Sequence, residues 1–144
     1  MNRLLRPGLV VLTGIEWALG LWTAFFPRSF YEDYPTVDLT PPFSEHLMRD
    51  FGGATLGLAV VVTAAAVWPE RRLVVTALLA YLAFSVPHLV FHVEHLHGAS
   101  TLDAVVLVTT LLASVLLPLV LLVVASRRRP ETFPRERMPE VDVR

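Results

Sequence analysis

Residues 102–125 read LDAVVLVTTLLASVLLPLVLLVVA, an apolar run with one charged residue, Asp103, near its beginning. A bilayer core of about 30 Å is crossed by roughly 20 apolar helical residues, so this stretch predicts a membrane-spanning helix. Three other stretches meet the same length, at residues 5–26, 47–68 and 73–96. Pro27, Pro69 and the segment at 97–100 mark the ends between them. The sequence therefore predicts an all-α integral membrane protein, a four-helix bundle.

The composition of the chain agrees with this interpretation. Of its 144 residues, 54% are hydrophobic and 17% are charged, whereas soluble domains carry about 25% charged residues. Cysteine is absent, which excludes disulfides, thiolate metal sites and cysteine nucleophiles. The net charge is −1 and gives no argument for nucleic-acid binding. We expect one transmembrane domain over residues 1–126 and a charged, disordered cytoplasmic tail over residues 127–144.

The arginine residues predict the orientation of the spans. Every basic residue is an arginine, and arginines stand before the first span, between the second and third, and after the fourth. Positively charged residues in short loops next to membrane spans stay on the cytoplasmic side. These three regions therefore lie on one side, which gives an antiparallel up-down-up-down bundle in the plasma membrane with both termini cytoplasmic. The lipid bilayer is the first predicted partner.

Each predicted span carries polar or small side chains on one face, at spacings of three and four residues. These are Thr13, Glu16, Gly20 and Thr23 in the first span, His46, Arg49, Asp50, Gly53 and Gly57 in the second, Tyr81, Ser85, His88, His92 and His95 in the third, and Asp103, Thr110 and Ser114 in the fourth. Because buried charges in a bilayer tend to face the bundle interior, we expect the four stripes to meet there. The inner halves of the same stripes are apolar, with Leu9, Val60, Ala64, Ala77, Leu117 and Leu121. The pattern predicts an outward-facing polar pocket above an apolar plug.

The histidines make the most specific motif. His88, His92 and His95 are spaced by four and three residues, which places three imidazoles in one narrow arc of a helix. His46 and Asp50 form a second pair at i and i+4 and complete a candidate metal site. Imidazole and carboxylate ligands without sulfur suit Zn, Fe, Mn or Cu. Bis-histidine haem ligation is a weaker alternative, because the large side chains of the third span leave little space.

A hydrogen-bonded network is the competing interpretation of the same residues. Arg49 would pair with Glu16 or Asp103, since an unpaired charge in the membrane is expensive. Glu16 and Asp103 would otherwise act as metal ligands or as acceptors that orient an imidazole.

Three segments resemble a known group of proteins. They are GLWTAFFPRSFY at 20–31, EHLMRDFGG at 45–53 and PHLVFH at 87–92. They look like small four-span membrane proteins of actinobacteria, and the resemblance extends over about residues 3–125. The layout, with an arginine and paired glycines opening the second span, is also similar to the DoxX-like superfamily, some of whose members are membrane subunits linked to quinone-dependent sulfur oxidation or redox stress. The closer group implies a plasma-membrane location and no particular activity.

Three functions follow from these patterns. The first is an accessory or interaction subunit that binds other membrane subunits or a second copy of itself. The second is a metal- or haem-binding redox protein at the outer leaflet, and the third is a small-ligand binder or transporter. No nucleophile elbow, phosphate loop or dinucleotide fingerprint is present in the sequence. The residues thus leave open whether the protein is an enzyme.

Overall fold

The computed structural model describes residues 4–39 and 42–127, and that part of the chain is helical without strands. Its four long helices are α1 (Leu5–Phe25), α3 (Glu45–Val67), α4 (Arg71–Glu94) and α5 (Thr101–Ser126). The short helix α2 (Pro27–Asp33) and the 3₁₀ turn η1 (Val37–Leu39) lie between α1 and α3. All four long helices are long and apolar enough to cross a membrane. The prediction of an all-helical protein with four such helices is confirmed.

The helix ends follow from local sequence signals. Pro27 is the first residue of α2, where its missing N–H is no loss. Ser44 precedes α3 and accepts a hydrogen bond from the Leu47 amide, at 3.4 Å. Gly98 lies between α4 and α5 with φ +88°, a conformation that glycine adopts without strain. The four long helices begin and end within two residues of the predicted spans. Beyond Arg127, the predicted tail lies outside the described residues.

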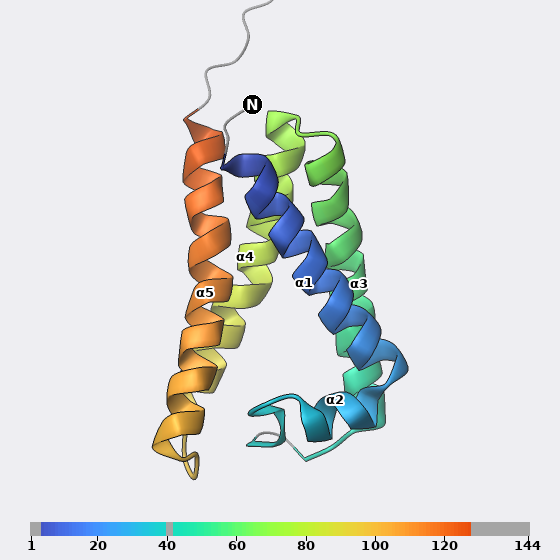
Figure 1. Cartoon of the computed structure of the whole chain (residues 1–144), viewed down its shortest axis with the longest axis vertical. Helices are drawn as coiled ribbons and strands as arrows, with labels where there is room; N and C mark the ends of the chain where they lie inside the picture. Colours follow the sequence, from blue (N-terminus) through green and yellow to red (C-terminus); the bar gives the residue numbers. More distant parts are fainter. Residues whose placement is uncertain (1–3, 40–41, 128–144) are drawn as a thin grey trace, which may run out of the picture.

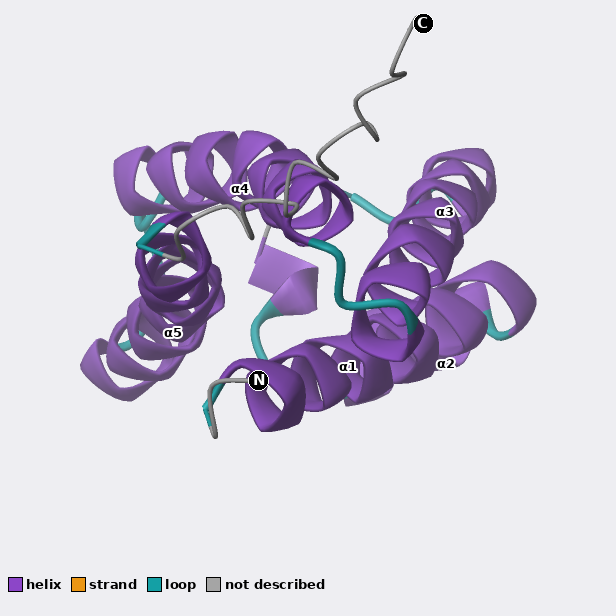
Figure 2. Cartoon of the chain, turned by 90° about the horizontal axis from the view of Figure 1, so that it is seen from above, coloured by secondary structure: helices purple, strands orange, loops and turns teal. Residues whose placement is uncertain are grey.

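The long helices are arranged as two pairs. α1 packs along α3 and α4 packs along α5, and the contacts between the pairs are fewer. Figure 1 shows that the two pairs lie close together where α1 begins and α5 ends, and diverge toward the other end, across which α2 lies. The view along the bundle in Figure 2 shows the same separation between α1 and α5. The molecule therefore has a closed end and an α2 end.

The apolar core fills the closed end. Its buried members are Leu5, Leu9, Leu12, Val62, Ala65, Ala66, Val74, Ala77, Leu78, Tyr81, Leu121 and Ala125. Leu9, Ala77 and Leu121 were expected in the apolar plug and are buried there. Val60 was also expected there, but it is exposed, and Val62 occupies the core instead. The prediction for Val60 is wrong because α3 is rotated about its axis relative to the orientation inferred from its polar stripe.

Small residues bring α1 and α3 close together. A Cβ atom built on Gly52 would lie 2.7 Å from the Cα of Ala24 in α1, and one built on Gly20 would lie 3.0 Å from the side chain of Leu56 in α3. In lipid, helix pairs gain little from the hydrophobic effect, so close backbone packing at small residues is a main source of their affinity. Gly52 therefore fixes the face that α3 turns toward α1.

This contact predicts opposite outcomes for two neighbouring glycines. Gly52→Ala forces the methyl group into the backbone of α1 and is expected to lower the free energy of unfolding by about 1–3 kcal/mol, as overpacking does. Gly53→Ala is the matched control, because a Cβ there meets nothing within 4 Å. The free energies of unfolding of both variants can be measured by titrating a denaturing detergent into mixed micelles. Equal stability of the two variants would contradict this packing.

Candidate functional site

The polar stripe of α3 faces outward except for Arg49, which reaches α1. This corrects the expectation that the stripe meets the others inside the bundle. The side chains of His46 and Asp50 are 88% and 66% exposed. Gly53 and Gly57 continue the stripe, and a Cβ on either would meet nothing within 4 Å. The residues of α3 that face the bundle are instead Met48, Gly52, Thr55, Ala59, Val62, Ala65 and Ala66. We call His46, Asp50, Gly53 and Gly57 the outer face of α3.

The candidate metal ligands come together as pairs. The rings of His88 and His92 are 4.7 Å apart between centroids, and His46 Nε2 lies 3.2 Å from Asp50 Oδ2. The α3 ring that faces His88 belongs to Phe51, at 6.2 Å, rather than to His46. Within residues 4–39 and 42–127, no three His, Asp or Glu side chains are close enough to hold one metal ion. The described structure thus does not assemble the five-residue ligand set.

His95 is held at the end of α4 by local contacts. Its Nδ1 lies 2.6 Å from the carbonyl oxygen of Phe91, and its ring stacks on the Phe91 ring at 4.1 Å between centroids. The side chain is otherwise exposed. These contacts occupy one ring nitrogen and direct the imidazole along its own helix.

Asp103 also has a local partner. Ser100 precedes α5, accepts a hydrogen bond from the Asp103 amide at 3.2 Å and donates its hydroxyl to Asp103 Oδ2 at 2.7 Å. Ser100 is thus the N-cap of α5: its Oγ satisfies one amide at the start of the helix, and its hydroxyl also holds the Asp103 carboxylate. The expected network between Asp103 and Arg49 is therefore replaced by a helix cap, whose Ser-x-x-Asp spacing was visible in the sequence.

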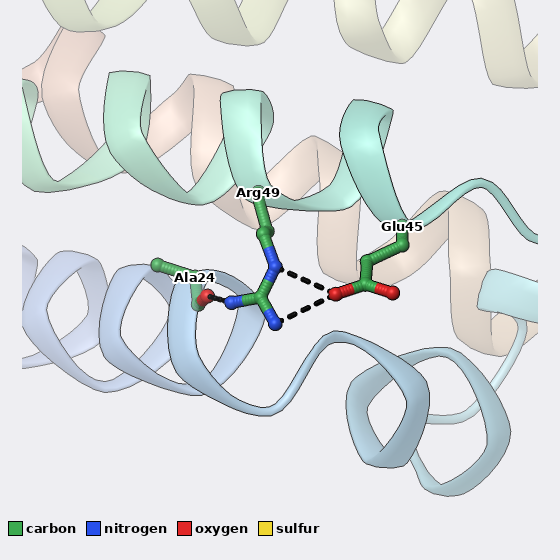
Figure 3. Close-up of polar contacts among 3 residues, drawn as sticks. All are labelled: Ala24, Glu45 and Arg49. Carbon is green, nitrogen blue, oxygen red and sulfur yellow. Dashed lines mark hydrogen bonds and ion pairs between the residues drawn. The ribbon is translucent and has the colours of Figure 1, made fainter.

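Arg49 links α3 to α1, as Figure 3 shows. Its Nε and Nη2 donate to Glu45 Oε1 at 2.9 and 2.8 Å, and its Nη1 donates to the carbonyl oxygen of Ala24 at 2.6 Å. Ala24 is in the last turn of α1, where carbonyl groups lack an intrahelical partner and the helix dipole is negative. The partner of Arg49 is thus Glu45, and the expected pairing with Glu16 or Asp103 is wrong.

The stripes of α1 and α4 do meet inside the bundle. Glu16 is 4% exposed, and the Tyr81 hydroxyl of α4 is the polar group beside its carboxyl group. Ser85 lies one turn beyond Tyr81 and is also fully buried. Among the described residues, no hydrogen-bond partner is present for Glu16 Oε2, Thr13 Oγ1 or Ser85 Oγ. The interior polar cluster therefore consists of an acid and hydroxyl groups rather than histidines.

Aromatic side chains pack α2 against the end of α1. The Trp22 indole donates to Ser29 Oγ at 3.1 Å, and its ring meets Phe30 edge to face at 5.5 Å. Arg28 lies over the Phe43 ring at 4.5 Å. α2 therefore lies on the α1–α3 pair near Arg49.

Two of these contacts were missed from the sequence for different reasons. The Glu45–Arg49 pair has i, i+4 spacing, a signal that identifies helical ion pairs. The Ala24 carbonyl carries no such signal, because a backbone group becomes an acceptor only where two helices approach. The Trp17 indole donates to Thr63 Oγ1 of α3 at 3.0 Å. This hydrogen bond also has no signal in the sequence, because it forms only where α1 and α3 approach each other.

No protein-family model, curated protein or solved structure matches this chain. The resemblance to DoxX-like proteins thus stays a prediction.

The link made by Arg49 predicts a specific loss of stability. Arg49→Ala removes a charged donor from the end of α1 and is expected to lower the free energy of unfolding by about 1 kcal/mol, since the side chain is half exposed. Glu32→Ala is the comparison, because it removes the similar 2.8 Å pair with Arg28 inside a short helix and keeps Arg28 over the Phe43 ring. Titration with a denaturing detergent measures both free energies of unfolding. A larger effect of Glu32→Ala would contradict the role assigned to Arg49.

Proposed function

We propose that the protein is an interaction subunit of the plasma membrane, and that the outer face of α3 binds the same face of a second copy. The observation that carries this proposal is the outward direction of a face that combines two glycines with a charged pair. Lipid tails offer such a face neither hydrogen bonds nor large side chains to pack against. A second helix supplies close packing instead.

The surface beside this face suits a helix. Gly53 and Gly57 are one turn apart, so another backbone can approach closely along that side. Further toward the closed end, a hollow of about 230 Å³ continues the same side of α3. It is lined by Trp17, Val60, Thr63, Ala64, Val67 and Trp68. The small residues and the hollow together leave room for another helix along most of α3.

A second copy is the occupant that this geometry favours. Copies inserted in the same orientation present parallel α3 helices, which is the arrangement in which Gly-x3-Gly pairs associate. A two-fold axis normal to the bilayer then brings identical faces together. Asp50 is accompanied by His46, and Glu45 by Arg49. Each copy therefore presents paired rather than isolated charges at this end.

Energy transfer between labelled copies in lipid vesicles tests this association. Gly57→Leu is expected to raise the protein density needed for half-maximal transfer at least about tenfold, a loss of roughly 1.4 kcal/mol. Gly14→Leu is the matched control, since Gly14 in α1 also has nothing within 4 Å of a built Cβ. Wild-type transfer in the Gly57 variant would overturn the proposed interface, and so would a wild-type chain that stays monomeric at every density.

We also propose that the four spans alternate in direction, with the closed end in the cytoplasm and the α2 end outside. The arginine distribution supports this orientation. The chain has no cysteine, so single cysteines can report the side. Asp38 is exposed in η1 at the α2 end, and Ser126 is exposed at the closed end.

An impermeant maleimide should label Asp38→Cys in intact cells, and Ser126→Cys only after permeabilisation. The opposite labelling pattern would reverse the orientation, and labelling of both sites in intact cells would contradict the alternating arrangement.

A further inference from the structure

Glu16 is the one carboxylic acid in the middle of the four long helices. The other ionisable side chains of α1, α3 and α5 lie in their first two turns, and those of α4 lie toward its ends except for Tyr81. The Tyr81 hydroxyl is the group that faces the Glu16 carboxyl. No basic side chain of the described residues is paired with this acid. A carboxylate without a counter-ion at this depth is expensive, and an uncharged carboxylic acid is much less so.

Within residues 4–39 and 42–127, the hydrogen-bonding needs of this cluster are not met. Oε2 of Glu16 and Oγ of Ser85 have no partner, although Glu16 is 4% and Ser85 1% exposed. Thr13 Oγ1, one turn before Glu16, lacks a partner as well. Buried polar atoms are almost always satisfied, by protein groups or by ordered water. These atoms therefore need small hydrogen-bonding partners that the described residues do not supply.

Access to Glu16 is asymmetric. Along α4, Tyr81 and Ser85 are buried, His88 and His92 are partly buried, and His95 is exposed. In the other direction, Leu9, Leu12 and Leu78 of the core are fully buried. The helix pairs also diverge toward the α2 end (Figure 1). Polar residues of α4 thus lie between Glu16 and the α2 end, while an apolar layer separates it from the closed end.

We propose that Glu16 is a proton-binding site that exchanges its proton with the aqueous phase at the α2 end, by way of water held along Ser85 and His88. The proton neutralises the acid, and water beside Oε2 and Ser85 Oγ completes their hydrogen bonds. His88 packs against the rings of Phe84 and Phe51 and touches His92. These imidazoles are the titratable groups on the path. The ionisable groups of α3 and α5 lie further out, at the α2 end.

Dicyclohexylcarbodiimide tests this site, because it is membrane-soluble and reacts with protonated carboxyl groups. The acid adds across one C=N bond: its oxygen bonds to the central carbon and its proton moves to nitrogen. The adduct then rearranges to an acylurea of equal mass. Mass spectrometry of wild-type protein should find it at Glu16, while Glu94, which is exposed, serves as an internal comparison. Glu16→Gln should lose the adduct and keep its melting temperature.

Sealed vesicles of known orientation identify the side of exchange. Alkaline buffer at the α2 end should lower the rate of adduct formation at Glu16 several-fold, and alkaline buffer at the closed end should leave it unchanged. Ser85→Ala should slow the response to buffer pH several-fold. Ser114→Ala is the control, because the Ser114 hydroxyl already donates to the Leu111 carbonyl at 2.7 Å.

Three results would overturn the proposal: no adduct at Glu16, a rate controlled from the closed end, or protection by Na⁺ at constant pH. The last would show that the carboxylate binds a metal ion rather than a proton.

Discussion

The close approach of α1 and α3 at Gly52 and Ala24 determines much of the remaining structure. Successive helical residues are rotated by about 100°, so once Gly52 lies against α1, Gly53 and Asp50 cannot also face the interior. The same approach brings the Ala24 carbonyl within reach of Arg49. Packing and hydrogen bonding therefore hold α1 and α3 together at the α2 end, where the two helix pairs diverge.

The bilayer explains why such a small contact can decide the orientation of a helix. Lipid tails are as apolar as leucine or valine, so the outward faces of the helices carry large apolar side chains without penalty. Exposed valines such as Val60 and Val61 are thus ordinary in this setting. The selection between faces falls to small residues and to polar groups with particular partners. α3 has glycines on two faces, and the one with the closer fit faces α1.

Polar groups in the spans are used in three different ways. Ser100 and Asp103 cap a helix, and Arg49 connects two helices. Glu16 and Ser85 retain unpartnered atoms in the interior. The spacing of polar residues in the sequence does not distinguish these three uses, since it shows only on which side of the helix a residue lies. Groups with partners among the described residues have a structural role, and the lack of such a partner for Oε2 distinguishes Glu16, which we propose to bind a proton.

The sequence by itself determined the number of spans, their limits within two residues and the apolar character of the closed end. Length and hydropathy suffice for these, because a helix must satisfy its own backbone across the membrane. Glu16 was also placed correctly among interior groups, as a single acid in an apolar span has few alternatives. Whether the second span turned His46 and Asp50 inward was decided only by the tertiary structure. Helix rotation depends on contacts between backbones. The lack of space for a Cβ at Gly52, which would lie 2.7 Å from the Cα of Ala24, is a property of two helices that neither sequence segment contains alone.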